Sequence, residues 1–325
     1  MMKMSVVVIA HGDPENLRAL LAALKAQTVA SELEVVLVGP EPDRLFQDSE
    51  LADFAGFQRL RGTVIPSSSE ARTTGVKAAR APVVAFVEDH CFPLPGWAEA
   101  LIERHQEEWS GVGPVVLNGN PRTATSWGNY LIEYGDWAYP IEGGASSHIP
   151  GHNSSYKREA LLSLEPHLAD LLEAETTMQW KMAEFGHRFF LEPEARARHY
   201  NFSKLSASLG LRFFGGWLFG ANRFAPSDSR RFLYLMASPL IPLVRFKKVL
   251  ASCRRLGKSL SWCLARLPLM FALLLFDGLG EAMGYATNRS AYAMAYCSNS
   301  EIDRARYLSN KDRESFNCEA AVHHR

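Results

Sequence analysis

Apolar and polar positions alternate regularly through the first third of the chain. Short apolar runs such as "MSVVVIA", "LEVVLVG" and "PVVAFVE" predict buried strands. Between them, leucines recur at helical spacing from Leu17 to Leu24, and "EARTTGVKAARA" is a second helical segment. Strands that alternate with helices are typical of βαβ units, so residues 4 to 105 predict an α/β fold around a mainly parallel sheet.

A different pattern begins beyond residue 210. From Ser229 to Phe276 there are nine basic residues and no acid, interspersed with apolar runs such as "LPLMFALLLF". The runs are shorter than the roughly 20 apolar residues of a spanning helix, although residues 260–279 reach that length if Arg266 lies near one end. The pattern suits helices at an anionic membrane surface. It also suits helices that pack on the rest of the chain or in a dimer.

Composition narrows the class of protein. A chain of 325 residues that is 47% hydrophobic can fill a sizeable core, which excludes disorder of the whole. Lys and Arg balance Asp and Glu at 35 each, so we expect no nucleic-acid partner. The five cysteines form no CxxC pair, which argues against a disulfide framework and a structural zinc site and favours a reducing compartment. The apolar start is too short for a secretory signal and predicts the first strand.

An acidic triplet with a histidine, Glu88-Asp89-His90, follows the run "PVVAFV". In sheets of this class, ligands bind beyond the carboxyl ends of the strands. Carboxylates and an imidazole can hold Mg²⁺ or Mn²⁺ when a phosphate supplies the remaining oxygens. Taken alone, the triplet is equally consistent with a solvated loop.

Four segments in order, spread over residues 4 to 205, together resemble glycosyltransferase family 2. They are "SVVVIAHGDPENLRALLAALKAQT", "ARTTGVKAARAPVVAFVEDHCFPLPGW", "PGHNSSYKREAL" and "EAETTMQWKMAEFGHRFFLEPEARARHY". The second resembles the family's Asp-x-Asp triplet with its preceding Ala-Arg helix, and the third its Gly-x-Asn loop. The resemblance implies a GT-A fold and transfer of a sugar, with inversion, from a nucleotide-diphosphate sugar to a glycan or lipid-linked acceptor.

The resemblance also implies a metal site for Mg²⁺ or Mn²⁺. Glu88 takes the first position of the family's triplet and His90 the last, which is the metal ligand in the family. His199 falls where GT-A enzymes often place a further ligand. A structural role for a lone histidine remains the alternative.

Further roles follow from the same alignment. Inversion needs one base, and the family's Glu-Asp motif points to Glu175, with Glu173 as the reserve. Both acids could instead only charge the first turn of a helix. The residues expected to contact the nucleotide-sugar are Arg72, Glu41, Glu88, Asp89, His152 and Asn153.

Two departures from the family pattern concern the nucleotide. The family ends its second strand with Asp-Asp-Gly-Ser, where this chain has "VLVGPEPD", so Glu41 or Asp43 would have to substitute. The family's Pro-Thr-Tyr-Asn becomes Ile-Ala-His-Gly at residues 9–12. These changes keep two alternatives open: a non-catalytic member that binds a nucleotide or sugar, and a membrane-associated scaffold.

The sequence therefore predicts three regions. Residues 1–210 form the GT-A domain, residues 211–290 a basic and apolar helical region associated with a membrane, and residues 291–325 a polar, loose tail. The expected location is the cytoplasmic face of the cell membrane, by peripheral or monotopic attachment or a single spanning helix. Four aromatics from Trp127 to Trp137 share one helical face, which suits sugar stacking or a core.

Overall fold

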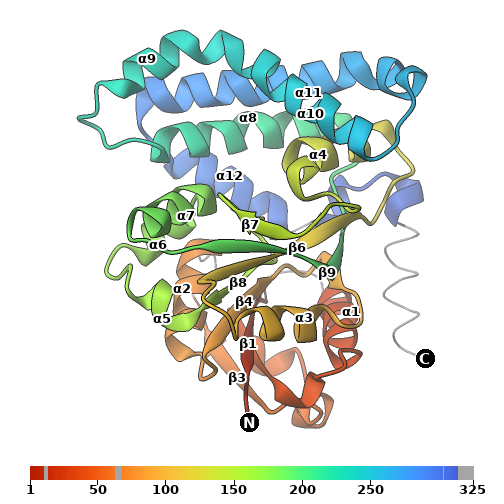
Figure 1. Ribbon diagram of the computed structural model, residues 1–325, viewed down its shortest axis with the longest axis vertical. Helices are drawn as coiled ribbons and strands as arrows, with labels where there is room; N and C mark the ends of the chain where they lie inside the picture. The colour runs from red at the N-terminus through yellow and green to blue at the C-terminus, as the bar shows by residue number, and fades with distance from the viewer. Residues whose placement is uncertain (11–13, 63–67, 303, 314–325) are drawn as a thin grey trace. The chain divides into compact units, whose positions relative to one another are not determined.

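The computed structural model describes residues 1–10, 14–62, 68–302 and 304–313 (Figure 1). The chain divides into two compact units. Among the described residues, the sheet unit contains Met1–Leu117 and Ile141–His199, and the helical unit contains Asn118–Pro140 and the residues from Tyr200 to Arg313. The predicted boundary at residue 210 differs from this division, because residues 118–140 fold with the C-terminal helices. His11 and Gly12, part of the departure at the first strand, lie outside the described residues.

One sheet forms the centre of the sheet unit, in the order β3-β2-β1-β4-β8-β6-β9-β5 with β7 beside β9. Its strands are β1 (Met4–Ile9), β2 (Leu33–Gly39), β3 (Gly56–Arg61), β4 (Val83–Val87), β5 (Cys91–Pro93), β6 (Gly111–Asn118), β7 (Gly144–Ser146), β8 (Ser155–Lys157) and β9 (Phe189–His199). The first four are parallel neighbours, as predicted, whereas β8 pairs antiparallel with β4 and β6, and β9 with β5 and β7. The sheet is therefore mixed.

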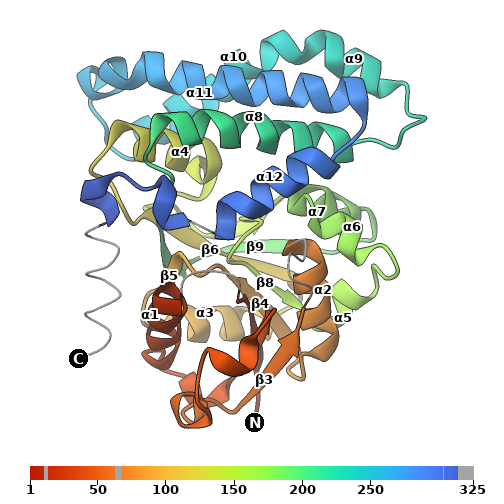
Figure 2. The ribbon, with the colours of Figure 1, turned by 180° about the vertical axis from the view of Figure 1, so that it is seen from behind.

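Helices flank this sheet (Figures 1 and 2), and their buried apolar side chains contribute to the core. They are α1 (Pro14–Lys25), α2 (Ser68–Ala78), α3 (Trp97–Arg104), α5 (Arg158–Leu162), α6 (Leu168–Leu172) and α7 (Glu175–Glu184), with short 3-10 turns at Ala30–Glu32, Pro42–Arg44 and Asp48–Leu51. β1, β2 and β4 are buried along almost their whole length, which is why they read as continuous β-branched runs. Val7, Val36 and Phe86 from these strands pack with Tyr156 and Met178 in one core.

Strand pairing brings together the two ends of the predicted metal site. β9 runs antiparallel to β5, and its last residue, His199, is registered opposite Cys91. Cys91 directly follows His90 in the chain. The register of one short strand pair thus places His199 beside the triplet that follows β4.

The helical unit consists of α4 (Ala124–Glu133), the 3-10 turn η4 (Gly135–Trp137), α8 (Leu205–Asn222), α9 (Arg230–Ala237), the 3-10 turn η5 (Ser238–Leu240), α10 (Ile241–Arg255), α11 (Leu260–Thr287), α12 (Ala291–Ile302) and the 3-10 turn η6 (Arg304–Tyr307). Within it, α8 and α11 lie side by side (Figure 2). Glycines allow this approach: a Cβ at Gly216 would lie 2.2 Å from the Asp277 carbonyl oxygen, and one at Gly284 would lie 2.4 Å from that of Trp217. Residue numbers rise along both helices in the same direction through these contacts, so α8 and α11 run parallel.

Helix α11 is also long and apolar enough to cross a membrane, with a mean hydropathy of 1.7 in its best window, of which 39% is buried inside the protein. The aromatic stripe on and after α4 belongs largely to the core of the helical unit. Tyr130 and Tyr134 are fully buried, and Trp127 packs edge-on against Trp262 at 5.4 Å between ring centroids.

The structure differs from the expected loose tail after residue 290. Helix α12 occupies the first 12 residues of that segment, and three of them are alanine, the strongest helix former. Tyr296 of α12 packs on Phe214 of α8, with ring centroids 4.1 Å apart. An aromatic contact of this kind fixes the helix in the helical unit, which the polar composition did not reveal.

Candidate active site

The triplet begins where β4 ends. The Glu88 N–H donates to the side-chain oxygen of Asn153 at 3.0 Å, and the Cys91 N–H donates back to the Glu88 carbonyl at 3.0 Å. The chain therefore turns tightly through Asp89 and His90 before β5. This turn places the three side chains of the triplet at the carboxyl end of the parallel strands, as the sequence predicted.

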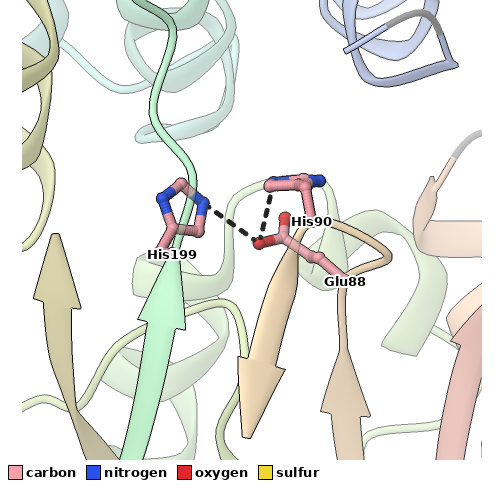
Figure 3. A group of neighbouring side chains, drawn as sticks. All are labelled: Glu88, His90 and His199. Atoms are coloured by element: carbon pink, nitrogen blue, oxygen red, sulfur yellow. Dashed lines mark ion pairs between the residues drawn. The ribbon is translucent and has the colours of Figure 1, made fainter. Parts of the chain in front are cut away.

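Three side chains converge there as a candidate metal centre: Glu88, His90 and His199 (Figure 3). Their ligand atoms lie within 4.8 Å of one another. One Glu88 oxygen, Oε2, is 3.5 Å from His90 Nε2 and 3.6 Å from His199 Nε2. Both imidazoles are almost fully buried, at 2% and 1% exposure, so they are held rigidly toward the carboxylate.

Asp89 contacts the other side of the His90 ring. Its Oδ1 lies 3.0 Å from His90 Nδ1. A carboxylate at Nδ1 favours the tautomer that carries its proton there, which leaves the Nε2 lone pair directed at Glu88 and His199. Asp89 was predicted to contact the nucleotide-sugar, and its observed position is that of a group that orients His90.

The Gly-x-Asn loop supports Glu88 from the opposite side. Asn153 is fully buried and has a left-handed backbone at φ 66°, and its Nδ2 donates to Glu88 Oε2 at 3.1 Å. Gly151 lies against Glu175, and a Cβ at residue 151 would lie 2.9 Å from the Cβ of Glu175. The glycine leaves room for the side chain of Glu175, and the asparagine holds Glu88 in place.

The second Glu88 oxygen faces a cluster that contains the predicted base. His152 Nδ1 is 3.2 Å from Glu88 Oε1 and 3.1 Å from Glu175 Oε1. Arg72, buried on α2, donates to Glu175 and lies 4.0 Å from Glu88 Oε1. Glu88 therefore shares one oxygen with the metal triad and the other with the cluster of Arg72, His152 and Glu175, hereafter the base cluster.

Mutual pairing sets the charge states in the base cluster. Burial alone would raise the pKa of Glu175, but His152 and Arg72 outweigh it and lower the pKa to about 2. Burial alone would lower the pKa of His152, but Glu175 and Glu88 outweigh it and raise the pKa to about 10. Burial likewise opposes ionisation of Glu88, and His152, His90 and His199 hold its pKa well below the ordinary value. At neutral pH both carboxylates are ionised.

Two predicted residues make other contacts. Glu41 pairs with the neighbouring Arg44 at 3.0 Å, and its side chain is 64% exposed. Glu173 ends α6, one residue before the N-cap of α7, whereas Glu175 begins α7 and points into the base cluster. Arg72 was predicted to contact the donor. Its pairing with Glu175 was not predicted, because the two residues are far apart in the sequence and no local motif links them.

The family of the chain follows from comparison with known proteins. Residues 5–164 match the model named Glycosyl transferase family 2. This part of the chain is a family 2 glycosyltransferase domain. The fold is GT-A, with a mixed central sheet and a C-terminal helical region. Glu175 and His199 lie beyond the matched residues, so only their geometry associates them with the candidate site around Glu88.

Two individual proteins are similar to this chain. Polypeptide N-acetylgalactosaminyltransferase 12 of Mus musculus is 30% identical over 121 residues, which cover 35% of this chain and 21% of the relative. The chain thus spans about a fifth of that relative's length. A solved structure titled "Crystal structure of GalNAc-T7 with UDP, GalNAc and Mn2+" has a TM-score of 0.47 at 17% identity, covering 62% of this chain and 43% of that chain.

Proposed function

We propose that the chain transfers a sugar from a nucleotide-diphosphate sugar to a hydroxyl of a glycan or lipid-linked acceptor, with inversion and metal assistance. The observation that carries the proposal is the double contact of Glu88. Through its two oxygens, the candidate metal ligands and the candidate base share one small site at the end of the parallel strands. Inverting transfer needs those two functions on either side of a single sugar.

The residues of the triad fit a divalent cation. Two imidazole nitrogens and a carboxylate oxygen converge within 4.8 Å, and Asp89 orients one of the imidazoles. Imidazole is a poor ligand for Mg²⁺, which prefers oxygen, so this donor set favours Mn²⁺ over Mg²⁺. When bound, the cation supplies Lewis-acid neutralisation of the leaving diphosphate.

The base cluster explains how the chain's own residues could take part in transfer. Arg72 and His152 are the cations of the site, and a diphosphate competes with Glu175 for both. While paired, Glu175 is a weak base, because its pKa is lowered to about 2. As the donor draws Arg72 away, Glu175 loses an opposite charge, its proton affinity rises, and its carboxylate can accept the acceptor hydroxyl's proton.

The direct test is turnover. The purified chain is incubated with nucleotide-diphosphate sugars that differ in base and sugar, with Mn²⁺, with Mg²⁺ and with a chelator, and release of the nucleoside diphosphate is measured. We expect release that requires a cation. Tight binding of a nucleotide diphosphate with no release at any donor would instead identify a binding module, the alternative that the departures from the family pattern at residues 9–12 and after the second strand keep open. A chain that binds no nucleotide would be a scaffold.

We further propose attachment to the cytoplasmic face of a membrane. Support comes from the stretch between residues 229 and 276, which has nine basic residues and no acid, and from the apolar length of α11. The expected partner is an anionic lipid surface.

A further inference from the structure

We propose that the helical unit binds an anionic bilayer through one exposed face of α9, η5 and α10, and that α11 lies in the plane of the membrane and does not cross it. The inference rests on the membrane attachment proposed above and specifies its mode. It is independent of the transfer chemistry.

The face that we assign to lipid is apolar and exposed. Beginning on α9, it continues through η5 into the first turn of α10, and at every position the side chain is more than half exposed. We call these residues the lipid face: Phe232, Leu233, Met236, Leu240, Leu243 and Val244. Their spacings of one, three or four residues keep them on one side of consecutive helices.

The same side of α10 becomes basic further along. Lys247 and Lys248 follow Val244 by one helical turn, and Arg254 lies two turns beyond them; all three are exposed, and Lys248 also pairs with Asp136 at 3.5 Å. Apolar side chains followed by lysine and arginine match the hydrocarbon boundary and the anionic headgroups of a bilayer. A second copy of this chain seated on the face would bring like charges together, which argues for lipid as the occupant.

The contacts of α11 argue against a crossing. Leu264, Phe271, Leu275 and Leu279 form an exposed apolar stripe, but Asp277 on the buried side pairs with Arg245 of α10. Glu281, one turn later, pairs with the same Arg245.

Helices α10 and α11 are antiparallel neighbours, since Gly278 lies against Pro242 while Cys263 contacts Cys253. A crossing by α11 would therefore either break the Arg245 pairs or draw Lys247, Lys248 and Arg254 into hydrocarbon, and both are strongly unfavourable. An in-plane position keeps the ion pairs and exposes the stripe to lipid.

The first test is co-sedimentation of the full chain with vesicles of phosphatidylcholine alone and with phosphatidylserine added. We expect binding to the anionic vesicles. The variant Phe232→Ser/Leu240→Ser/Val244→Ser should lower the partition coefficient about tenfold or more, because three side chains lose apolar burial. The matched control is Trp180→Ser/Phe185→Ser, which removes exposed aromatics of the sheet unit and should bind as the parent does. Circular dichroism confirms that each variant is folded.

The second test asks on which side the ends of α11 lie. With Cys297 and Cys318 replaced by serine, Ser261→Cys and Thr287→Cys each place an exposed thiol at one end of α11. The protein is bound to preformed anionic vesicles, and an impermeant maleimide is added outside. We expect both ends to react fully before detergent is added.

Each outcome decides a separate point. Protection of one end until detergent is added would overturn the in-plane position while leaving membrane attachment standing. A full chain that stays in the supernatant with anionic vesicles at low salt would overturn attachment itself, and a dimer in light scattering would then identify a second copy as the occupant. Neither result bears on nucleoside diphosphate release.

Discussion

The two oxygens of Glu88 face different chemistry. Oε2 lies toward His90 and His199, and Oε1 lies toward His152 and, at 4.0 Å, Arg72. Removal of any one partner therefore changes the charge balance on both sides. At the scale of single residues, the site behaves as one electrostatic unit, and substitutions can separate its functions.

Replacing His90 by alanine should lower Mn²⁺-supported turnover by about tenfold or more, because a proposed metal ligand is lost.

Asp89→Asn should weaken Mn²⁺ affinity by about 10–100-fold while leaving all three proposed ligands in place, since it removes the carboxylate that orients His90. A turnover assay with Mn²⁺ tests the first prediction, and calorimetric titration with Mn²⁺ gives the affinity of both proteins. His167→Ala, an exposed histidine on the surface, is the control. Unchanged Mn²⁺ affinity in the His90→Ala protein would exclude a metal role.

Glu175→Gln should reduce transfer by about 100-fold or more and keep the affinity for the nucleotide-sugar, because a base acts in the transition state and not in ground-state binding. Glu173→Gln is the matched control, two residues away and outside the base cluster contacts described above. Turnover and equilibrium donor binding are measured for both. An active Glu175→Gln protein beside an inactive Glu173→Gln protein would show that the motif register is shifted.

The base cluster should leave a signature in the pH dependence of stability. His152 has a folded pKa raised to about 10 from an ordinary value of 6.5, so its contribution is fully present below pH 6.5 and is lost as the pH rises through 10. Glu175, lowered to about 2 from 4.5, contributes above pH 4.5 and loses its contribution as the pH falls through 2. The Tm difference between the parent and His152→Gln should thus be largest between pH 5 and 6.5, and it should disappear as the pH rises through about 10. A difference independent of pH would contradict the pairing.

At the scale of elements, glycine determines how α8 packs on α11. Gly220 faces the Glu281 carbonyl oxygen, 2.5 Å from where a Cβ would lie, whereas a Cβ at Gly215 meets nothing within 4 Å. The two glycines are on the same helix, five positions apart, and only one of them is required by packing. The parallel approach of the two helices is backbone against backbone at these positions.

The same substitution should therefore have opposite signs at these glycines. Gly215→Ala should stabilise the chain by up to about 1 kcal/mol, the difference in helix propensity. Gly220→Ala should destabilise it, since the methyl group meets backbone that can move only if the helices separate. Thermal unfolding of both proteins gives the comparison. Equal Tm changes of the same sign would mean that α8 does not pack on α11 in this way.

At the scale of the whole molecule, the proposed function requires that the folded chain recognise a nucleotide. A ligand that binds only the folded state raises the Tm. At a concentration 100 times its Kd, it adds about 2.7 kcal/mol to the free energy of unfolding. We expect at least one nucleoside diphosphate to raise the Tm with Mn²⁺ present and a smaller rise with a chelator. His90→Ala should reduce the metal-dependent part of that rise. A screen in which no nucleotide changes the Tm would leave only the scaffold alternative.

Much of this organisation could be predicted from sequence, for physical reasons that differ by feature. β1, β2 and β4 were predicted because buried parallel strands have continuous apolar runs. The triad of Glu88, His90 and His199 was predicted by motif order, and the structure brings all three together. The pairing of Arg72 with Glu175 was not predicted, because it depends on the tertiary fold. Helix α12 was not predicted, because the composition of its segment is polar and does not reveal the aromatic contact with α8.

The register of β9 against β5 has a consequence for how the protein matures. His199 reaches the triplet only through its pairing opposite Cys91, and it leaves the ribosome long after Glu88 and His90. A nascent chain therefore has an incomplete set of the proposed ligands until β9 has joined the edge of the sheet. Tight cation uptake would then report completion of the domain, so that a chain stalled or cleaved before β9 would remain unloaded and could be told apart from the finished protein.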